Sequence, residues 1–110
     1  MRLHVLDARV GDASILRDVP HLRASMRAAA RAGGATVVTE AFHVFPNGGV
    51  TGVLVLAQSH LSIHTWPELR LANVDLLTYG SVDGALIMGV MRERLGAVDG
   101  SIELIERECR

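Results

Sequence analysis

The chain has 110 residues, 49% of them hydrophobic, and a formal net charge of −1, so we expect a single domain over residues 1–110 with one core. All its fixed positive side chains are arginines and they form no basic run, which disfavours nucleic-acid binding. No apolar run of about 18 residues and no signal-type N-terminus is present, so we expect no membrane association and a cytoplasmic location. One cysteine, Cys109, excludes an intramolecular disulfide and a cysteine-based zinc site.

The first third of the sequence predicts a strand followed by a helix. Residues 2–8 alternate apolar and polar side chains, with Leu3 and Val5 on one face and Leu6 on the other, as in a short strand. After the segment GDAS, which offers capping side chains, an apolar residue recurs every three or four positions over residues 15–29. The pair Gly33-Gly34 ends this amphipathic helix, because glycine adopts the left-handed conformation of a C-cap.

The remaining sequence predicts strands, one more helix and a last strand. Residues 35–45 are rich in β-branched and aromatic residues, PNGG marks a turn, and an apolar strand returns from residue 50 with its alternation continuing to Trp66. Residues 71–79 read as a strand, 81–96 as a helix and 101–106 as a closing strand. The order β-α-β-β-β-α-β predicts an α+β two-layer sandwich, a mainly antiparallel sheet with two helices on one face.

Unusual chemistry lies in the stretch SHLSIHTWPE, residues 59–68, which directly follows the apolar run. A metal site at His60 and His64 is disfavoured, because on a strand the two lie about 13 Å apart. A hydrolase triad of Ser59, His64 and Asp75 lacks the glycine-flanked elbow that usually carries the serine. An ordinary strand with two hydrogen-bonded histidines stays open on residue types alone.

A self-cleaving serine is a further alternative. The Ser59 hydroxyl can attack the carbonyl carbon of Gln58, which converts the peptide bond into an ester. A base such as His64 then removes the serine Cα proton, and β-elimination cuts the chain and leaves a dehydroalanine. This tautomerises and hydrolyses to a pyruvoyl group, which does the work of pyridoxal phosphate as an electron sink. A hydroxyl such as that of Thr51 would hold the transient oxyanion. The spacing of these residues does not by itself decide between the alternatives.

The stretch LAQSHLSIHTWPE, preceded by FHVFPNGGVTG and followed by ANVDLLTYG, resembles the prokaryotic S-adenosylmethionine decarboxylase proenzymes, and the resemblance covers nearly the whole chain. It implies cleavage between Gln58 and Ser59 into a β chain, residues 1–58, and an α chain, residues 59–110. It implies a pyruvoyl cofactor made from Ser59, with no pyridoxal phosphate and no metal, that forms a Schiff base with a small amino-acid-type substrate. It also implies a homodimer with its active sites at the interface.

The resemblance implies roles for further residues. His64 corresponds to the histidine that drives the elimination, and Thr51 stands where the family has a processing serine. The expected substrate-binding residues are an aromatic that lies against the substrate, a carboxylate that binds ribose hydroxyls, a carboxylate near the active site and a neighbouring indole: Phe45, Glu68, Asp7 and Trp66.

Three departures from the family pattern stand out. Gln58 replaces a glutamate, and Ala8 and Arg9 replace an aromatic pair. Tyr79 stands where the family has the catalytic cysteine that reprotonates the substrate carbon, which makes Tyr79 the candidate proton donor. An unperturbed phenol has a pKa near 10, against about 8.5 for a thiol.

The function expected from the resemblance is a decarboxylase of polyamine (spermidine) biosynthesis that acts on S-adenosylmethionine. The replaced acid keeps two alternatives open. One is a pyruvoyl-dependent decarboxylase of ornithine or arginine, and the other is an inactive homologue that regulates an active subunit. The intact Ser59 and His64 argue against the inactive homologue, because such a subunit has no need to process itself.

Overall fold

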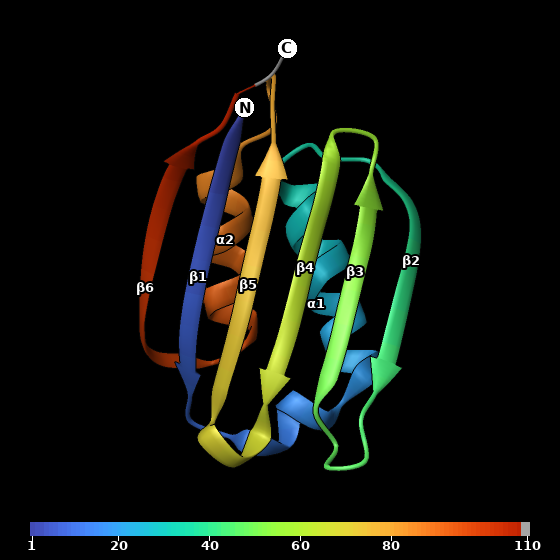
Figure 1. Cartoon of the computed structure of the whole chain (residues 1–110), viewed down its shortest axis with the longest axis vertical. Coiled ribbons are helices and arrows are strands. Elements are labelled where there is room, and N and C mark those ends of the chain that lie inside the picture. The colour runs from blue at the N-terminus through green and yellow to red at the C-terminus, as the bar shows by residue number, and fades with distance from the viewer. Residues whose placement is uncertain (109–110) are drawn as a thin grey trace.

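Six strands form one antiparallel sheet in the computed structural model, which describes residues 1–108, and two α-helices cover one of its faces (Figure 1). Cys109 lies outside the described residues. The strands follow the order β2-β3-β4-β5-β1-β6 across the sheet, and the predicted α+β sandwich is confirmed. The elements in chain order are β1 (Arg2–Val10), the 3₁₀ turn η1 (Ala13–Arg17), α1 (Val19–Ala32), β2 (Val37–Val44), β3 (Val50–Leu56), β4 (Ser59–Trp66), the 3₁₀ turn η2 (Pro67–Leu69), β5 (Leu71–Thr78), α2 (Gly84–Arg94) and β6 (Ala97–Glu106).

The predicted element order is wrong by one strand. The alternation that runs on from Val50 to Trp66 belongs to two strands, β3 and β4, which form a hairpin with Leu56 opposite Ser59. Ala57 and Gln58 make the turn, and neither is a residue type that marks a turn, so the sequence pattern carries no break there. Ser59 has a φ of 126°, a conformation usually left to glycine.

The ends of other elements also differ from the prediction. The helix expected from Ile15 is split, because Asp18 leaves helical geometry and its side chain accepts a hydrogen bond from the backbone N–H of His21, so that α1 begins at Val19. Pro20 lies in the first turn of α1, where its missing N–H costs nothing. The second helix begins only after its own cap, Asp83, and the last strand begins early, at Ala97.

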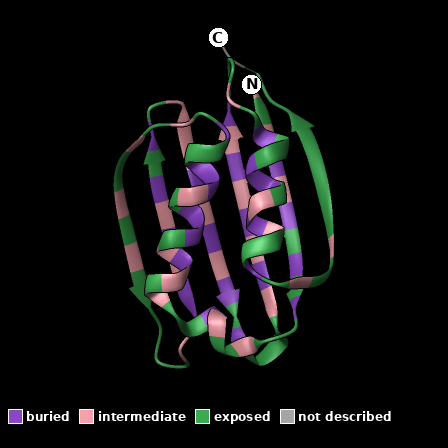
Figure 2. Cartoon of the chain, turned by 180° about the vertical axis from the view of Figure 1, so that it is seen from behind, coloured by how far each residue is buried: buried purple, intermediate pink, exposed green. Residues whose placement is uncertain are grey.

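The core lies between the sheet and the helices, and the buried residues concentrate in the central strands beneath α1 and α2 (Figure 2). Burial of each such side chain contributes about 1.5–3 kcal/mol. The core includes Leu6, Leu54, Leu61, Ile63 and Leu76 from the sheet and Leu22, Met26, Ile87, Met88 and Met91 from the helices. The predicted alternation of β4 is confirmed: Leu61 and Ile63 face the helices, whereas His60, Ser62 and His64 are half-buried on the other face.

Polar contacts join strands β2, β3 and β4 to the layer that contains η1 and α1. Thr65, which is fully buried, donates its hydroxyl to the carbonyl of Leu16 (2.7 Å) and accepts from the N–H of Val50 (2.9 Å). The Glu40 carboxylate joins β2 to α1 by ion pairs with Arg23 and Arg27. Hydrogen bonds first from Arg23 and then from Arg27 lower the pKa of Glu40 below its ordinary value.

Neither helix of residues 1–108 is long and apolar enough to span a membrane.

Candidate active site

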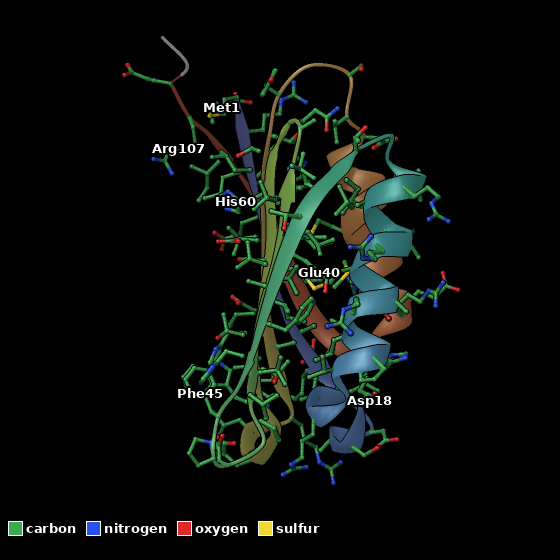
Figure 3. The ribbon with its side chains drawn as sticks, turned by 90° about the vertical axis from the view of Figure 1, so that its right-hand side faces the viewer. Met1, Asp18, Glu40, Phe45, His60 and Arg107 are labelled. Carbon is green, nitrogen blue, oxygen red and sulfur yellow. The ribbon has the colours of Figure 1, made fainter. Side chains whose placement is uncertain are left out.

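The face of the sheet away from the helices carries three rows of side chains, because residues on neighbouring strands lie in register. The polar row is formed by Thr51, His64, Asn73 and Asp7. The middle row is formed by Val53, Ser62, Asp75 and Val5, and the His60 row by Val55, His60, Leu77 and Leu3. Figure 3 shows His60 and Phe45 on this open face at different heights, His60 toward one end of the sheet and Phe45 toward the other.

An aromatic cluster surrounds His64 at one end of the open face. The His64 ring lies edge-on between those of Phe45 and Trp66, with centroid distances of 5.6 and 4.4 Å, and its Nδ1 lies 2.6 Å from the Thr51 hydroxyl. Phe45, His64 and Trp66 line a cavity of about 440 Å³. The Glu68 carboxylate lies near the rim, 3.5 Å from the side-chain amide of Asn47, which is part of the cavity wall. Aromatic rings with a carboxylate at the rim form a site suited to a flat ring that carries hydroxyl groups.

Asn73, which the sequence analysis did not identify, holds this cluster together. Its amide oxygen accepts a hydrogen bond from the Trp66 indole N–H (2.6 Å), and its amide N–H donates to the Asp7 carboxylate (2.7 Å). The available signal was the alternation of β5, which puts Asn73 on the face opposite the core. The amide thereby fixes Trp66 against His64 and joins Asp7 to the site.

The expected cleavage site lies at the other end of the open face. The turn before Ser59 is held by the backbone of Thr36, the residue that precedes β2. The Thr36 carbonyl accepts a hydrogen bond from the N–H of Ala57 (2.9 Å), and its N–H donates to the Gln58 side chain (3.2 Å). The Ser59 hydroxyl lies 3.4 Å from Nδ1 of His60. Neighbouring side chains on a regular strand point to opposite faces, so this contact depends on the positive φ of Ser59.

His60 and Asp75 extend the contact from Ser59 into the middle of the sheet. Nε2 of His60 lies 3.8 Å from the Asp75 carboxylate, and the Ser62 hydroxyl donates a hydrogen bond to the same carboxylate oxygen. From the sequence, Asp75 is a candidate only as a partner of His64. The pairing of Ser62 with Asp75 across β4 and β5 puts Asp75 diagonally between His60 and His64, and the contact that forms within 4 Å is the one with His60.

The structure does not bring Ser59 and His64 together within one chain. They lie five residues apart on the same strand, a separation of about 16 Å. A hydrolase triad of Ser59, His64 and Asp75 is therefore not assembled in the chain. The described residues, 1–108, contain no group of three or more histidine, cysteine or acidic side chains that could hold a metal ion.

Tyr79 lies at the Ser59 end of the sheet. It follows β5 two residues after Leu77, which pairs with His60, and its side chain is half exposed. It borders a cavity of about 400 Å³ that also contacts His4 and Gly84. Burial lowers the pKa of His4, so the group beside this cavity is a neutral imidazole at physiological pH.

Comparison with known proteins gives a consistent result. The S-adenosylmethionine decarboxylase family matches residues 2–108. The S-adenosylmethionine decarboxylase proenzyme of Pseudomonas paraeruginosa is 47% identical over 91 residues, which are 82% of this chain and 57% of that protein. The proenzyme of Thermotoga petrophila is 48% identical over 69 residues, 63% of this chain and 53% of that protein. The chain thus spans little more than half the length of these curated relatives.

A solved structure is similar as well. The crystal structure of the adenosylmethionine decarboxylase from Aquifex aeolicus VF5 matches with a TM-score of 0.87 and 32% sequence identity, over 100% of this chain and 92% of that chain. The sequence and structural matches agree with each other along nearly the whole length of the chain. The chain belongs to the S-adenosylmethionine decarboxylase family.

Proposed function

We propose that this chain cleaves itself between Gln58 and Ser59 and then acts as a pyruvoyl-dependent decarboxylase of S-adenosylmethionine in polyamine biosynthesis. The observation that carries the proposal is the backbone of Ser59, whose φ is 126° directly after a two-residue turn. A non-glycine residue held in such a conformation costs on the order of 1–3 kcal/mol. Cleavage of the adjoining peptide bond releases that strain, so the site fits a serine that is consumed to make a cofactor.

The residues around Ser59 and His64 divide the work of decarboxylation. A pyruvoyl carbonyl made from Ser59 supplies an electron sink for the pair released with carbon dioxide. Phe45 binds the flat ring of the substrate, and Glu68 accepts hydrogen bonds from its ribose hydroxyls. Tyr79, at the same end of the sheet as Ser59, donates the proton to the substrate carbon.

A second copy of the chain is required for this division of work. The aromatic cluster around His64 and the hydroxyl of Ser59 lie at opposite ends of one open face, about 16 Å apart. A two-fold axis perpendicular to the strands, through the middle row, would lay the polar row of one protomer over the His60 row of its partner. Each of the two sites would then take Ser59 and Tyr79 from one protomer and His64 and Phe45 from the other.

The apolar side chains of the open face support such a homodimer. Val5, Val53 and Leu77 lie half-buried on a face that no helix covers, and Val55 is 42% exposed. Packing of two such faces removes these side chains from water, as between the sheets of a β-sandwich. Cytoplasmic localisation remains a prediction from the sequence.

S-adenosylmethionine is preferred to ornithine or arginine because the site retains groups suited to a nucleoside. Ornithine and arginine have no aromatic ring for Phe45 to contact and no ribose hydroxyls for Glu68. The names of the relatives, all S-adenosylmethionine decarboxylase proenzymes, support the same substrate. An inactive regulatory homologue is disfavoured by the strained serine, which has no use in a subunit that is never cleaved.

Denaturing mass spectrometry of the purified protein tests the proposal. We expect two chains, produced by a break between Gln58 and Ser59. The second chain should have a blocked N-terminus that reacts with phenylhydrazine. Ser59→Ala should give one uncut, inactive chain. Carbon dioxide release is then measured with S-adenosylmethionine, ornithine and arginine side by side. A single uncut wild-type chain that releases carbon dioxide would contradict the pyruvoyl chemistry, and release from ornithine alone would contradict the substrate.

A further inference from the structure

We propose that His60 is the general base that starts self-cleavage within its own chain, and that Asp75 is the positioning residue that supports it. The proposal rests on the self-processing proposed above and adds a catalytic residue to it. Two histidines would then act on each Ser59: His60 of the same chain and His64 of the partner.

The contacts of Ser59 single out His60. Its Nδ1 lies 3.4 Å from the Ser59 hydroxyl, whereas His64 of the same chain is about 16 Å away along the strand. The side chain of His60 is 38% exposed and its other ring nitrogen, Nε2, faces the Asp75 carboxylate at 3.8 Å. With Nε2 protonated and turned toward the carboxylate, Nδ1 is the free acceptor for the serine proton.

The first step balances without any added reactant. The Ser59 hydroxyl oxygen attacks the carbonyl carbon of Gln58, a C–O bond forms, and the hydroxyl proton passes to Nδ1 of His60. The C–N bond of the tetrahedral intermediate then breaks, and the proton returns from His60 to the leaving nitrogen. The peptide bond has become an ester with a free amine, and His60 is regenerated.

Asp75 stabilises the transient charge on His60. While the imidazole holds the extra proton it is an imidazolium, and the carboxylate 3.8 Å away offsets that charge in a half-buried position. The Ser62 hydroxyl donates to the same carboxylate oxygen and keeps it directed at His60. Serine, histidine and aspartate thus form a chain of contacts similar to that of a hydrolase, except that the acyl group is the chain's own backbone.

The two histidines act at different steps, and the steps can be separated chemically. The partner's His64, which the family resemblance connects with the elimination, acts only after the ester has formed. Loss of His60 should therefore hold the chain at the intact peptide bond, and loss of His64 should hold it at the ester. Hydroxylamine cleaves an ester and leaves the Gln58–Ser59 peptide bond intact, so it distinguishes these two uncut forms. It also attacks Asn–Gly bonds under forcing conditions, and intact mass separates a cut at Asn47–Gly48 from one at Gln58–Ser59.

The experiment follows freshly translated full-length chains by intact mass, with and without hydroxylamine. For His60→Ala we expect ester formation slowed by about 100-fold or more, the usual contribution of a general base, and no hydroxylamine-cleavable chain at early times. His64→Ala should accumulate chain that hydroxylamine cuts between Gln58 and Ser59. Asp75→Asn, which keeps an acceptor for Ser62, should slow ester formation about 10-fold. His21→Ala, in the helical layer on the other side of the sheet from Ser59, is the matched control and should process as the wild type does.

Two further measurements separate a chemical role from a structural one. Thermal melting of each uncut variant, made in the Ser59→Ala background, checks that the fold is kept. Added imidazole should restore ester formation to His60→Ala, because the cavity left by the side chain lies beside the serine. Wild-type rates for His60→Ala, or slow processing of a normally folded His60→Ala chain that imidazole does not restore, would overturn the proposal. Absence of both ester and cleavage in the wild type would instead refute the proposed function itself.

Discussion

The separation of Ser59 from His64 within one chain predicts that two inactive variants, one at each residue, will complement each other in a mixed dimer. Five residues of strand put about 16 Å between them, well beyond the reach of a proton transfer, so in the proposed homodimer the histidine comes from the partner. Ser59→Ala and His64→Ala chains, each uncleaved alone, are co-expressed in equal amounts with different affinity tags. Random pairing gives about one half mixed dimers, and each mixed dimer has one intact Ser59 facing one intact His64.

The expected amounts follow from this pairing. About one half of the His64→Ala chains should be cleaved and none of the Ser59→Ala chains, which leaves about one quarter of the wild-type number of active sites. In mixed dimers isolated through both tags, every His64→Ala chain should be cleaved and every Ser59→Ala chain should be uncut. The assay is intact mass of each tagged chain together with carbon dioxide release.

The matched control puts both substitutions in one chain and co-expresses it with the wild type. In such mixed dimers every site lacks either the serine or the histidine, so cleavage of wild-type chains should fall to about one half. If His64 acts within its own chain, wild-type chains will all be cleaved, and doubly tagged Ser59→Ala and His64→Ala dimers will remain uncut. That pair of results would refute the two-chain site.

Three other predictions concern single residues. Tyr79→Phe should leave cleavage unchanged and lower the rate of carbon dioxide release by about 100-fold, since it removes the proposed proton donor; unchanged turnover would exclude Tyr79 from that role. Thr65→Val, in the uncleavable Ser59→Ala background, should lower the free energy of unfolding in urea by about 2–4 kcal/mol, because two buried backbone groups lose their partner. Glu40→Gln should destabilise the chain most at neutral pH. The hydrogen bonds from its arginine partners lower the pKa of Glu40, so their stabilisation is complete above the ordinary value of 4.5 and is lost as the pH falls through the lower folded pKa. Melting temperatures of the two chains should converge in acid, and a gap that stays constant with pH would contradict this account.

The sequence was sufficient to predict the faces of the strands. Hydrophobic alternation is a local property with a period of two, so it assigns Leu61 and Ile63 to the core and His60 and His64 to the open face without knowledge of the fold. The same local pattern could not reveal the turn before Ser59. The residues of that turn, Ala57 and Gln58, have no turn preference, and the turn is held by backbone contacts to Thr36, distant in sequence.

The sequence by itself determined the family, the layer architecture and the residue types of the candidate site. These depend on short motifs and on periodicity, which a single strand or helix carries in full. Only the tertiary structure decided which of these residues meet. It joined Ser59 to His60 and Asp75, and it separated Ser59 from His64. The physical reason is that strand pairing brings together residues that are distant in the sequence, whereas an extended strand keeps nearby residues apart by about 3.3 Å for each position.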